Sequence, residues 1–117
     1  MRHPDVATVR HVYEALAVGN HSSARSILTD DAELEHHADW LDEDGLWRAV
    51  PLRFIDLHGG RILVVVREEP RNPRTPGTGL LLEPRLCCHL WTLRSGRAMA
   101  LQVRPDHEAA LADEGLV

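Results

Sequence analysis

Residues 46–68 read LWRAVPLRFIDLHGGRILVVVRE, and this stretch decides the fold class. Apolar residues recur through 46–57 and fill Ile62–Val66, a pattern typical of β-strands. Between them lies His58-Gly59-Gly60-Arg61, and a glycine pair favours the tight turn of a hairpin. The stretch therefore predicts two antiparallel strands, Leu46–Leu57 and Ile62–Glu68.

The chain after this hairpin predicts more β structure. Residues 69–79 contain three prolines and two glycines and predict an exposed loop. A long strand is expected over Leu80–Arg94, with a bulge or an edge position at Glu83-Pro84. A turn at 94–97 then leads into a last strand, Ala98–Val103.

Helical patterns occupy the two ends of the chain. The first eighteen residues predict an amphipathic helix with Asp5 as N-cap and Gly19 at its end. A shorter helix is expected to begin at Ser22 or Ser23 and to stop before Asp30, and Asp106 is expected to cap a third that stops at Gly115.

Before the hairpin, alternation over residues 32–37 predicts a strand with His36 on its inner face. This order predicts an α+β fold, an antiparallel sheet with its helices on one side.

Length and composition exclude several classes of protein. The 117 residues suit one domain, 1–117, and 44% apolar content excludes fibrous and wholly disordered chains. The net charge of −5 and the scattered basic residues argue against nucleic-acid binding. The longest apolar run, Ile62–Val66, is too short to span a membrane, and no signal segment is evident at the N-terminus.

The residue types also limit chemistry and location. All thirteen basic residues are arginine, so a lysine Schiff base is excluded. Cys87 and Cys88 are neighbours whose side chains would point to opposite faces of a strand, which makes a disulfide between them unfavourable. The expected location is the cytoplasm.

Several stretches together resemble one family. Tyr13-Glu14-Ala15-Leu16-Ala17-Val18-Gly19-Asn20, followed by Leu28-Thr29-Asp30-Asp31-Ala32, resembles the opening of nuclear-transport-factor-two-like proteins, a superfamily that includes ketosteroid isomerase and the SnoaL-like polyketide cyclases. Residues 88–97 resemble the last two strands of SnoaL-like members, and residues 106–116 resemble their closing helix. The resemblance implies a cone-shaped, curved antiparallel sheet wrapped around the N-terminal helices, with a pocket at its open end.

One interval departs from that family pattern. Members fit a third helix and a strand between the positions of Trp40 and Gly59, and here the strand takes most of the interval. At most one helical turn is left, around Asp42–Trp47. Loss of that helix would expose apolar surface, including Trp40 and Trp47, so we expect a partner subunit and most simply a homodimer.

Four residues are candidates for acid–base chemistry. The resemblance places His36 where ketosteroid isomerase has its general base, and His89 near the position of that enzyme's proton-donating acid. Tyr13 lies one position from the isomerase's oxyanion tyrosine. Asp56 could orient a histidine or merely cap the turn at Gly59. The structural alternative for His36 is a partly buried imidazole satisfied by backbone or water, and for His89 it is a hydrogen bond to Tyr13 or Asp56.

The remaining candidates concern ligands and metals. The aromatic residues Trp40, Trp47, Phe54 and Trp91 would give a pocket flat walls for a ring-shaped ligand, although core packing would also explain them. The histidine pattern predicts no metal site, because successive side chains on one strand face seldom converge on one ion. Neither cofactor nor phosphate-binding motif is expected.

Two functions follow from these observations. The first is a domain that binds a small hydrophobic cyclic molecule; as an enzyme it would be a cofactor-independent isomerase or cyclase with His36 as base and His89 or Tyr13 stabilising the enolate. The alternative is a non-catalytic dimeric interaction or ligand-binding module.

Overall fold

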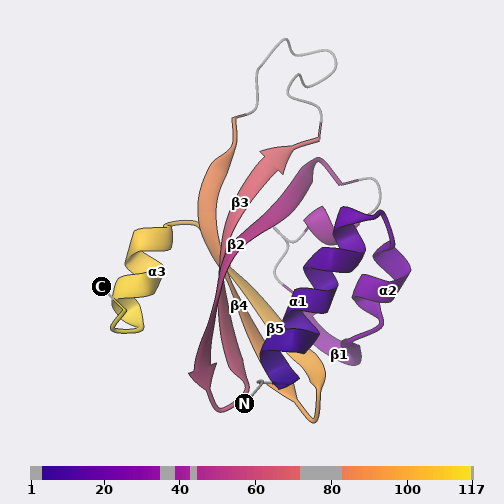
Figure 1. The fold of residues 1–117 in the computed structure, drawn as a ribbon, viewed down its shortest axis with the longest axis horizontal. Coiled ribbons are helices and arrows are strands. Elements are labelled where there is room, and N and C mark those ends of the chain that lie inside the picture. Colours follow the sequence, from indigo (N-terminus) through magenta and orange to yellow (C-terminus); the bar gives the residue numbers. More distant parts are fainter. Residues whose placement is uncertain (1–3, 35–38, 43–44, 72–82, 117) are drawn as a thin grey trace.

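The protein forms a five-stranded curved, unclosed sheet with helices on both sides (Figure 1). The computed structural model describes residues 4–34, 39–42, 45–71 and 83–116. Its elements, in chain order, are α1 (Pro4–Ala17), α2 (His21–Arg25), β1 (Leu28–Leu34), the single 3-10 turn η1 (Asp39–Leu41), β2 (Trp47–His58), β3 (Arg61–Pro70), β4 (Arg85–Arg94), β5 (Arg97–Arg104) and α3 (His107–Asp113).

The strand order is β1-β5-β4-β3-β2. The three pairs from β2 to β5 are antiparallel, as predicted, but β1 pairs with β5 in parallel. The prediction of a purely antiparallel sheet was therefore wrong at this edge. A tight turn forces its two strands to be antiparallel, whereas β1 reaches the sheet from the helices and is free of that constraint.

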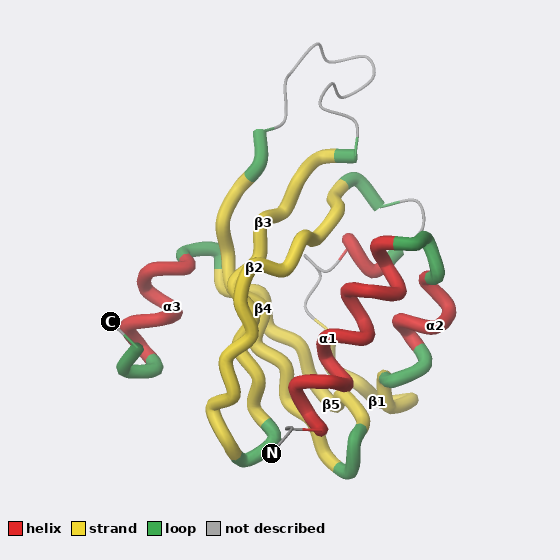
Figure 2. Tube along the Cα trace, viewed as in Figure 1, coloured by secondary structure: helices red, strands yellow, loops and turns green. Residues whose placement is uncertain are grey.

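Two apolar clusters lie on opposite faces of the sheet. On β3 and β4 the residues alternate between them: Ile62, Val64, Val66, Cys87 and Trp91 join the larger cluster under α1, and Leu63, Cys88 and Leu90 join the smaller one with Ala110 of α3. Figure 2 shows α1 and α2 on one side of the sheet and α3 on the other. The expectation of all helices on one side is thus wrong for α3.

A bulge in β2 reverses which residues face α1. Pro51 pairs with Val66 and Arg53 with Val65, so Leu52 is an extra residue in the strand. Before the bulge Trp47 and Ala49 pack against the larger cluster, and after it Phe54 does. In an unbroken strand Leu52 would share a face with Phe54, whereas here Leu52 is 55% exposed.

The β2–β3 turn depends on its glycines. His58, Gly59 and Gly60 all have positive φ, of 68°, 66° and 81°. A Cβ on Gly60 would lie 2.4 Å from the Leu93 carbonyl oxygen, while one on Gly59 would meet nothing within 4 Å. Only glycine therefore fits at position 60, where the turn lies against β4.

Helix boundaries follow the predicted signals in part. Asp106 caps α3, accepting the Ala109 N–H at 3.1 Å, as predicted. Asp5, however, lies inside the first turn of α1, which begins at Pro4 because proline suits the first helical position. The cap of α2 is Asn20, whose side chain accepts from Ser23 N, in place of Ser22 or Ser23.

Among the described residues between β1 and β2, one short helical turn is present, η1. It lies at Asp39–Leu41 and not at Asp42–Trp47. Trp40 is only 1% exposed within the single chain, and Trp47 is half-buried, so the expected exposure of Trp40 was wrong. His36 and residues 72–82 lie outside the described residues.

In the part of the chain described here, no helix combines the length and the apolar character that a membrane span requires.

Candidate functional site

A pocket of about 540 Å³ lies between the C-terminal half of α1 and the first half of β2. One wall is formed by Tyr13, Leu16 and Ala17 of α1, and another by η1 through Trp40. The remaining lining residues come from the chain around α2, from β2 and from the end of β3: Gly19, His21, Arg48, Ala49, Val50, Pro51 and Arg71. The lining is thus mainly apolar, with one arginine on β2 and another directly after β3.

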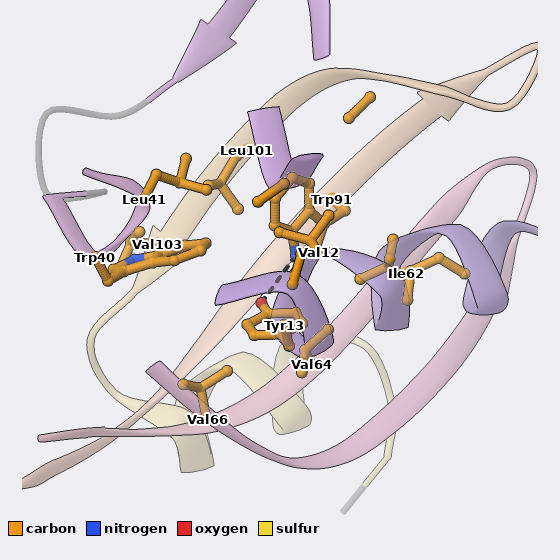
Figure 3. Close-up of a cluster of buried hydrophobic side chains, with 14 of the residues drawn as sticks. Val12, Tyr13, Trp40, Leu41, Ile62, Val64, Val66, Trp91, Leu101 and Val103 are labelled. Atoms are coloured by element: carbon orange, nitrogen blue, oxygen red, sulfur yellow. Dashed lines mark hydrogen bonds between the residues drawn. The ribbon is translucent and has the colours of Figure 1, made fainter. Parts of the chain in front are cut away.

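Tyr13 connects this pocket to the interior of the molecule. Its hydroxyl lies 2.7 Å from His89 Nδ1 and 3.0 Å from Trp91 Nε1, both on β4. Figure 3 shows the bond from Trp91 to the Tyr13 oxygen inside the larger apolar cluster. Tyr13 and His89 are both buried, and their hydrogen bond is one of the structural alternatives that the sequence had offered for His89.

The other ring nitrogen of His89 contacts a buried carboxylate. His89 Nε2 lies 2.9 Å from Glu68 Oε2 on β3. The second carboxylate oxygen, Oε1, accepts from Arg85 Nε at 2.8 Å and lies 2.7 Å from Arg85 Nη2. Tyr13, His89, Glu68 and Arg85 thus form one buried polar network that begins at the pocket and ends at the partly exposed guanidinium of Arg85.

The hydrogen-bond pattern assigns the protons of this network. An indole N–H only donates, so the Tyr13 oxygen accepts from Trp91 and its own O–H is left to donate to His89 Nδ1. His89 Nε2 then carries the hydrogen and donates to Glu68. With neutral His89 in this tautomer, each hydrogen bond among Trp91, Tyr13, His89 and Glu68 has one donor and one acceptor.

Electrostatics agree with that assignment. Burial lowers the pKa of His89 and outweighs the opposing effect of Glu68, which favours the neutral imidazole. Burial alone would raise the pKa of Glu68, but the hydrogen bond from His89, together with the hydrogen bond and the charge of Arg85, outweighs it and lowers the pKa, so the group stays a carboxylate. Burial also raises the pKa of Tyr13 well above its ordinary value, which keeps the phenol protonated.

Trp40 covers this network from the side of η1. Its indole stacks on the His89 ring with centroids 4.4 Å apart and an interplanar angle of 5°, and on the Tyr13 ring at 5.7 Å. Its Nε1–H is buried and has no hydrogen-bond partner among the described residues. Two contacts from α2 hold η1 in place: His21 Nδ1 lies 3.0 Å from the Leu41 carbonyl oxygen, and Arg25 pairs with Asp42.

Glu68, Cys87 and His89 form a buried cluster with metal-ligand character, because one ligand atom from each lies within 4.8 Å of the others. The chemistry of the donors argues against a divalent cation there. Burial, and then the charge of Glu68, raises the pKa of the Cys87 thiol, so the thiolate that metals bind is disfavoured. The Arg85 guanidinium already neutralises the carboxylate, and the prediction of no metal site stands as a prediction.

The other predicted site residues occupy different places. Asp56 Oδ1 accepts the His58 N–H at 2.8 Å, so it caps the β2–β3 turn, the alternative that the sequence had offered. Phe54 packs edge-on against Tyr13, and Trp91 supports the Tyr13 hydroxyl. Trp47 lies under Arg85, whose guanidinium is 4.3 Å from the ring centroid. Of the four predicted pocket aromatics, only Trp40 lines the pocket.

Sequence reasoning missed Glu68, Arg85 and the arginines of the pocket. One signal was available for Glu68, because it follows Ile62, Val64 and Val66 at intervals of two and therefore points to the same inner face. Its partner Arg85 lies directly opposite in the β3–β4 register. The sequence alone does not show which residue of β4 pairs with Glu68, because the residues between the two strands do not fix the register.

Comparison with known proteins identifies the fold. No family model and no curated protein sequence matches the chain. Among solved structures, an NTF2-like protein of unknown function from Burkholderia pseudomallei is similar with a TM-score of 0.68, at 20% identity, over 95% of this chain and 97% of that one. The protein TerC, co-crystallised with polyporic acid, gives a TM-score of 0.66 at 19% identity over 95% and 97%.

A third similar structure is a proposed polyketide cyclase from Sinorhizobium meliloti, with a TM-score of 0.63 at 18% identity over 84% of this chain and 94% of that one. A cystatin-fold protein from Novosphingobium aromaticivorans is also similar, with a TM-score of 0.64. The chain therefore has the nuclear-transport-factor-two-like fold that the sequence resemblance implied.

Proposed function

We propose that this protein, which has the nuclear-transport-factor-two-like fold, binds a small hydrophobic cyclic molecule in the pocket between α1, η1 and β2. The observation that carries the proposal is the pocket itself. Its volume of about 540 Å³ lies within the range of small-molecule sites, and its walls are apolar apart from a few polar groups. The Trp40 indole and the Tyr13 ring offer flat surfaces for a ring.

Two of the similar structures support a ring-shaped ligand. One was co-crystallised with polyporic acid, and another is a proposed polyketide cyclase. Both are distant in sequence, so they suggest a class of ligand and no particular compound.

The proposal can be tested with 2-naphthoic acid and its methyl ester as probes, by thermal-shift measurements and isothermal titration. We expect at least one probe to raise the melting temperature and to bind saturably. The variant Ala17→Phe, which places a ring in the pocket, should abolish this response, because Ala17 lines the pocket. The control Ala7→Phe makes the same change at an exposed position of α1 and should keep it.

An absent response in the natural chain would contradict the proposal. An equal response in Ala17→Phe and Ala7→Phe would also contradict it, since binding would then occur elsewhere.

A second candidate function is acid–base catalysis, and the buried polar network favours it. Tyr13 both lines the pocket and is held by His89, which is itself anchored by Glu68. In this proposal the Tyr13 O–H, which donates to His89 Nδ1 in the free protein, turns to donate to an enolate oxygen, and His89 and Glu68 are positioning residues that act through it. His36 keeps the role of general base that the sequence resemblance implied.

Catalysis can be tested by following exchange of the α-protons of 2-tetralone for deuterium by NMR. We expect the protein to accelerate exchange, and His36→Ala and Tyr13→Phe each to lower the rate about 100-fold. Exchange no faster than in buffer would contradict this function and leave the binding proposal intact.

The alternative is a non-catalytic module that acts by association, most simply as a homodimer. Leu52 and Leu86 are 55% and 43% exposed on β2 and β4, and they now give a better reason for association than the buried Trp40. Sedimentation velocity tests it: a dimer that Leu52→Glu or Leu86→Glu dissociates would support the module, and a monomer in the natural chain would contradict it. A cytoplasmic location stays a prediction from the sequence.

A further inference from the structure

We infer that the pocket selects ring compounds that carry a hydroxyl group, such as phenols and enols, and that His21 accepts the hydrogen of that group. The inference rests on the proposed binding function and specifies its ligand class. It is drawn from a ring nitrogen that the fold leaves unused at the pocket, on a residue that the sequence did not single out.

The hydrogen bond between His21 and η1 fixes the tautomer of the imidazole. His21 Nδ1 lies 3.0 Å from the Leu41 carbonyl oxygen, and a carbonyl oxygen only accepts, so Nδ1 carries the hydrogen. In the neutral ring the other nitrogen, Nε2, then has a lone pair and accepts hydrogen bonds. Within the described part of the chain, Nε2 has no hydrogen-bond partner of its own. His21 therefore has one free acceptor.

The position of His21 brings this acceptor to the pocket. His21 is the first residue of α2, is half-buried, and lines the pocket together with Tyr13 and Trp40. The Asn20 cap fixes the start of the helix, and the bond to Leu41 fixes the ring. The imidazole is thus oriented before a ligand binds, which lowers the entropic cost of using it.

The other polar side chains of the pocket do not offer the same group. The arginine and tryptophan side chains in the lining only donate. The Tyr13 oxygen already accepts from Trp91, and its O–H donates to His89. Among the described side chains that line the pocket, His21 is therefore the one with an open acceptor.

The end of α1 adds to the preference for a hydrogen-bond donor. Leu16 and Ala17 of its last turn line the pocket, and this turn contains no basic residue. The C-terminal end of a helix carries a partial negative charge, which favours a donor and opposes an anion. A neutral hydroxyl group therefore suits this part of the pocket better than a carboxylate does.

Selectivity follows from the cost of covering an acceptor without pairing it. A ring compound that lacks a hydroxyl group displaces water from Nε2 and gives no hydrogen bond in return, whereas the hydroxylated ring replaces that bond. We therefore expect 2-naphthol to bind about tenfold more tightly than 2-methoxynaphthalene, which has the same ring and oxygen but no donor hydrogen.

The test measures both compounds by isothermal titration at about pH 7.5, where an ordinary imidazole is mostly neutral. His21→Asn removes Nε2, while its amide nitrogen can still donate to the Leu41 carbonyl oxygen. This variant should lose the preference for 2-naphthol and keep the natural affinity for 2-methoxynaphthalene. His11→Asn makes the same change at an exposed position of α1 outside the pocket and should keep the preference.

NMR of the histidine ring nitrogens in the natural chain gives a second measurement that needs no variant. A hydrogen bond to Nε2 changes the electron density at that nitrogen. Addition of 2-naphthol should therefore shift the Nε2 resonance of His21, and 2-methoxynaphthalene should shift it much less.

Each outcome bears on one proposal or the other. Equal affinity of the natural chain for the two compounds, a preference that survives His21→Asn, or an Nε2 resonance that 2-naphthol does not shift would overturn the inference while the binding function stands. Binding of methyl 2-naphthoate without binding of 2-naphthol would overturn it as well. If none of these naphthalene probes binds, the binding function itself fails and the inference with it.

Discussion

The Tyr13 hydroxyl lies 2.7 Å from His89 Nδ1, although 76 positions separate the two residues in the chain. α1 supplies one partner and β4 the other, so the bond exists only when the helix packs on the inner face of the sheet. His89 is held from its other side by Glu68, and the three side chains are buried. Buried polar groups of this kind are stabilising only when each has its partner.

Removing the Tyr13 hydroxyl should therefore destabilise the fold. Tyr13→Phe keeps the ring but leaves Trp91 Nε1 without an acceptor and His89 Nδ1 without a donor. We expect a loss of about 2–4 kcal/mol, measured by urea unfolding. An unchanged midpoint with an unchanged slope would contradict the hydrogen-bond assignment.

The stability of the protein should fall as the solution becomes acidic, and His89 should contribute. Its folded pKa is lowered, so below its ordinary value of about 6.5 the unfolded chain takes up a proton that the native state does not. Native stability from this group is therefore full above that pH and declines below it, by up to about 1.4 kcal/mol per pH unit.

The chain has eight histidines, so the contribution of His89 must be separated from the others. Comparing the unfolding free energy of the natural chain with that of His89→Gln over the same pH range does this. The variant should be less stable at neutral pH, and its unfolding free energy should depend less on pH between neutral and mildly acidic conditions. Parallel pH profiles for the two proteins would contradict the lowered pKa.

At still lower pH, the stability of the folded protein should depend on Glu68. Its folded pKa is lowered from 4.5, so stability from this carboxylate is present above that value and declines as the pH falls towards the folded pKa. Glu68→Gln should remove this acid-limb contribution, and it should also destabilise the protein at neutral pH by about 1–3 kcal/mol, because His89 and Arg85 lose their charged acceptor. Denaturant titrations over the acid range measure both effects.

The two turn glycines offer a matched pair of substitutions. Gly60→Ala would place a Cβ 2.4 Å from the Leu93 carbonyl oxygen, and we expect a loss of several kcal/mol or failure to fold. Gly59→Ala has a similar positive φ but open space around it, so it should cost only about 1 kcal/mol. Equal effects in thermal unfolding would show that the approach to β4 does not matter.

The adjacent cysteines should be inert in the native state. Burial raises the pKa of both Cys87 and Cys88, and Glu68 raises that of Cys87 further. Iodoacetamide should therefore modify neither thiol in the folded protein and both after denaturation, as measured by mass spectrometry. Rapid labelling of a native thiol would contradict this burial.

The sequence was informative wherever the physical cause is local. Residues at intervals of two share a strand face, and Cys87, His89 and Trp91 do lie together on the face towards α1. The glycine pair gave the β2–β3 turn, and Asp106 gave the cap of α3. Each of these depends on a few neighbouring residues and on the periodicity of a single element.

The sequence was misleading in β2, where one extra residue interrupts the alternation of side chains along the strand. The extra residue at Leu52 inverts the alternation in β2, so Trp47 and Phe54 face the same side despite their odd spacing. Pro51 directly precedes the extra residue, but a proline is compatible with an edge strand as well as with a bulge, so it did not reveal the change of register.

What the sequence alone determined was the α+β class, the hairpin and the resemblance to one fold, because hydrophobic periodicity and turn chemistry act over short distances. Only the tertiary structure decided that Glu68 and Arg85 join Tyr13 and His89, and that His21 and Tyr13 line one pocket. These contacts depend on strand register and on how a helix packs across a sheet, and both are set by the burial of the whole core.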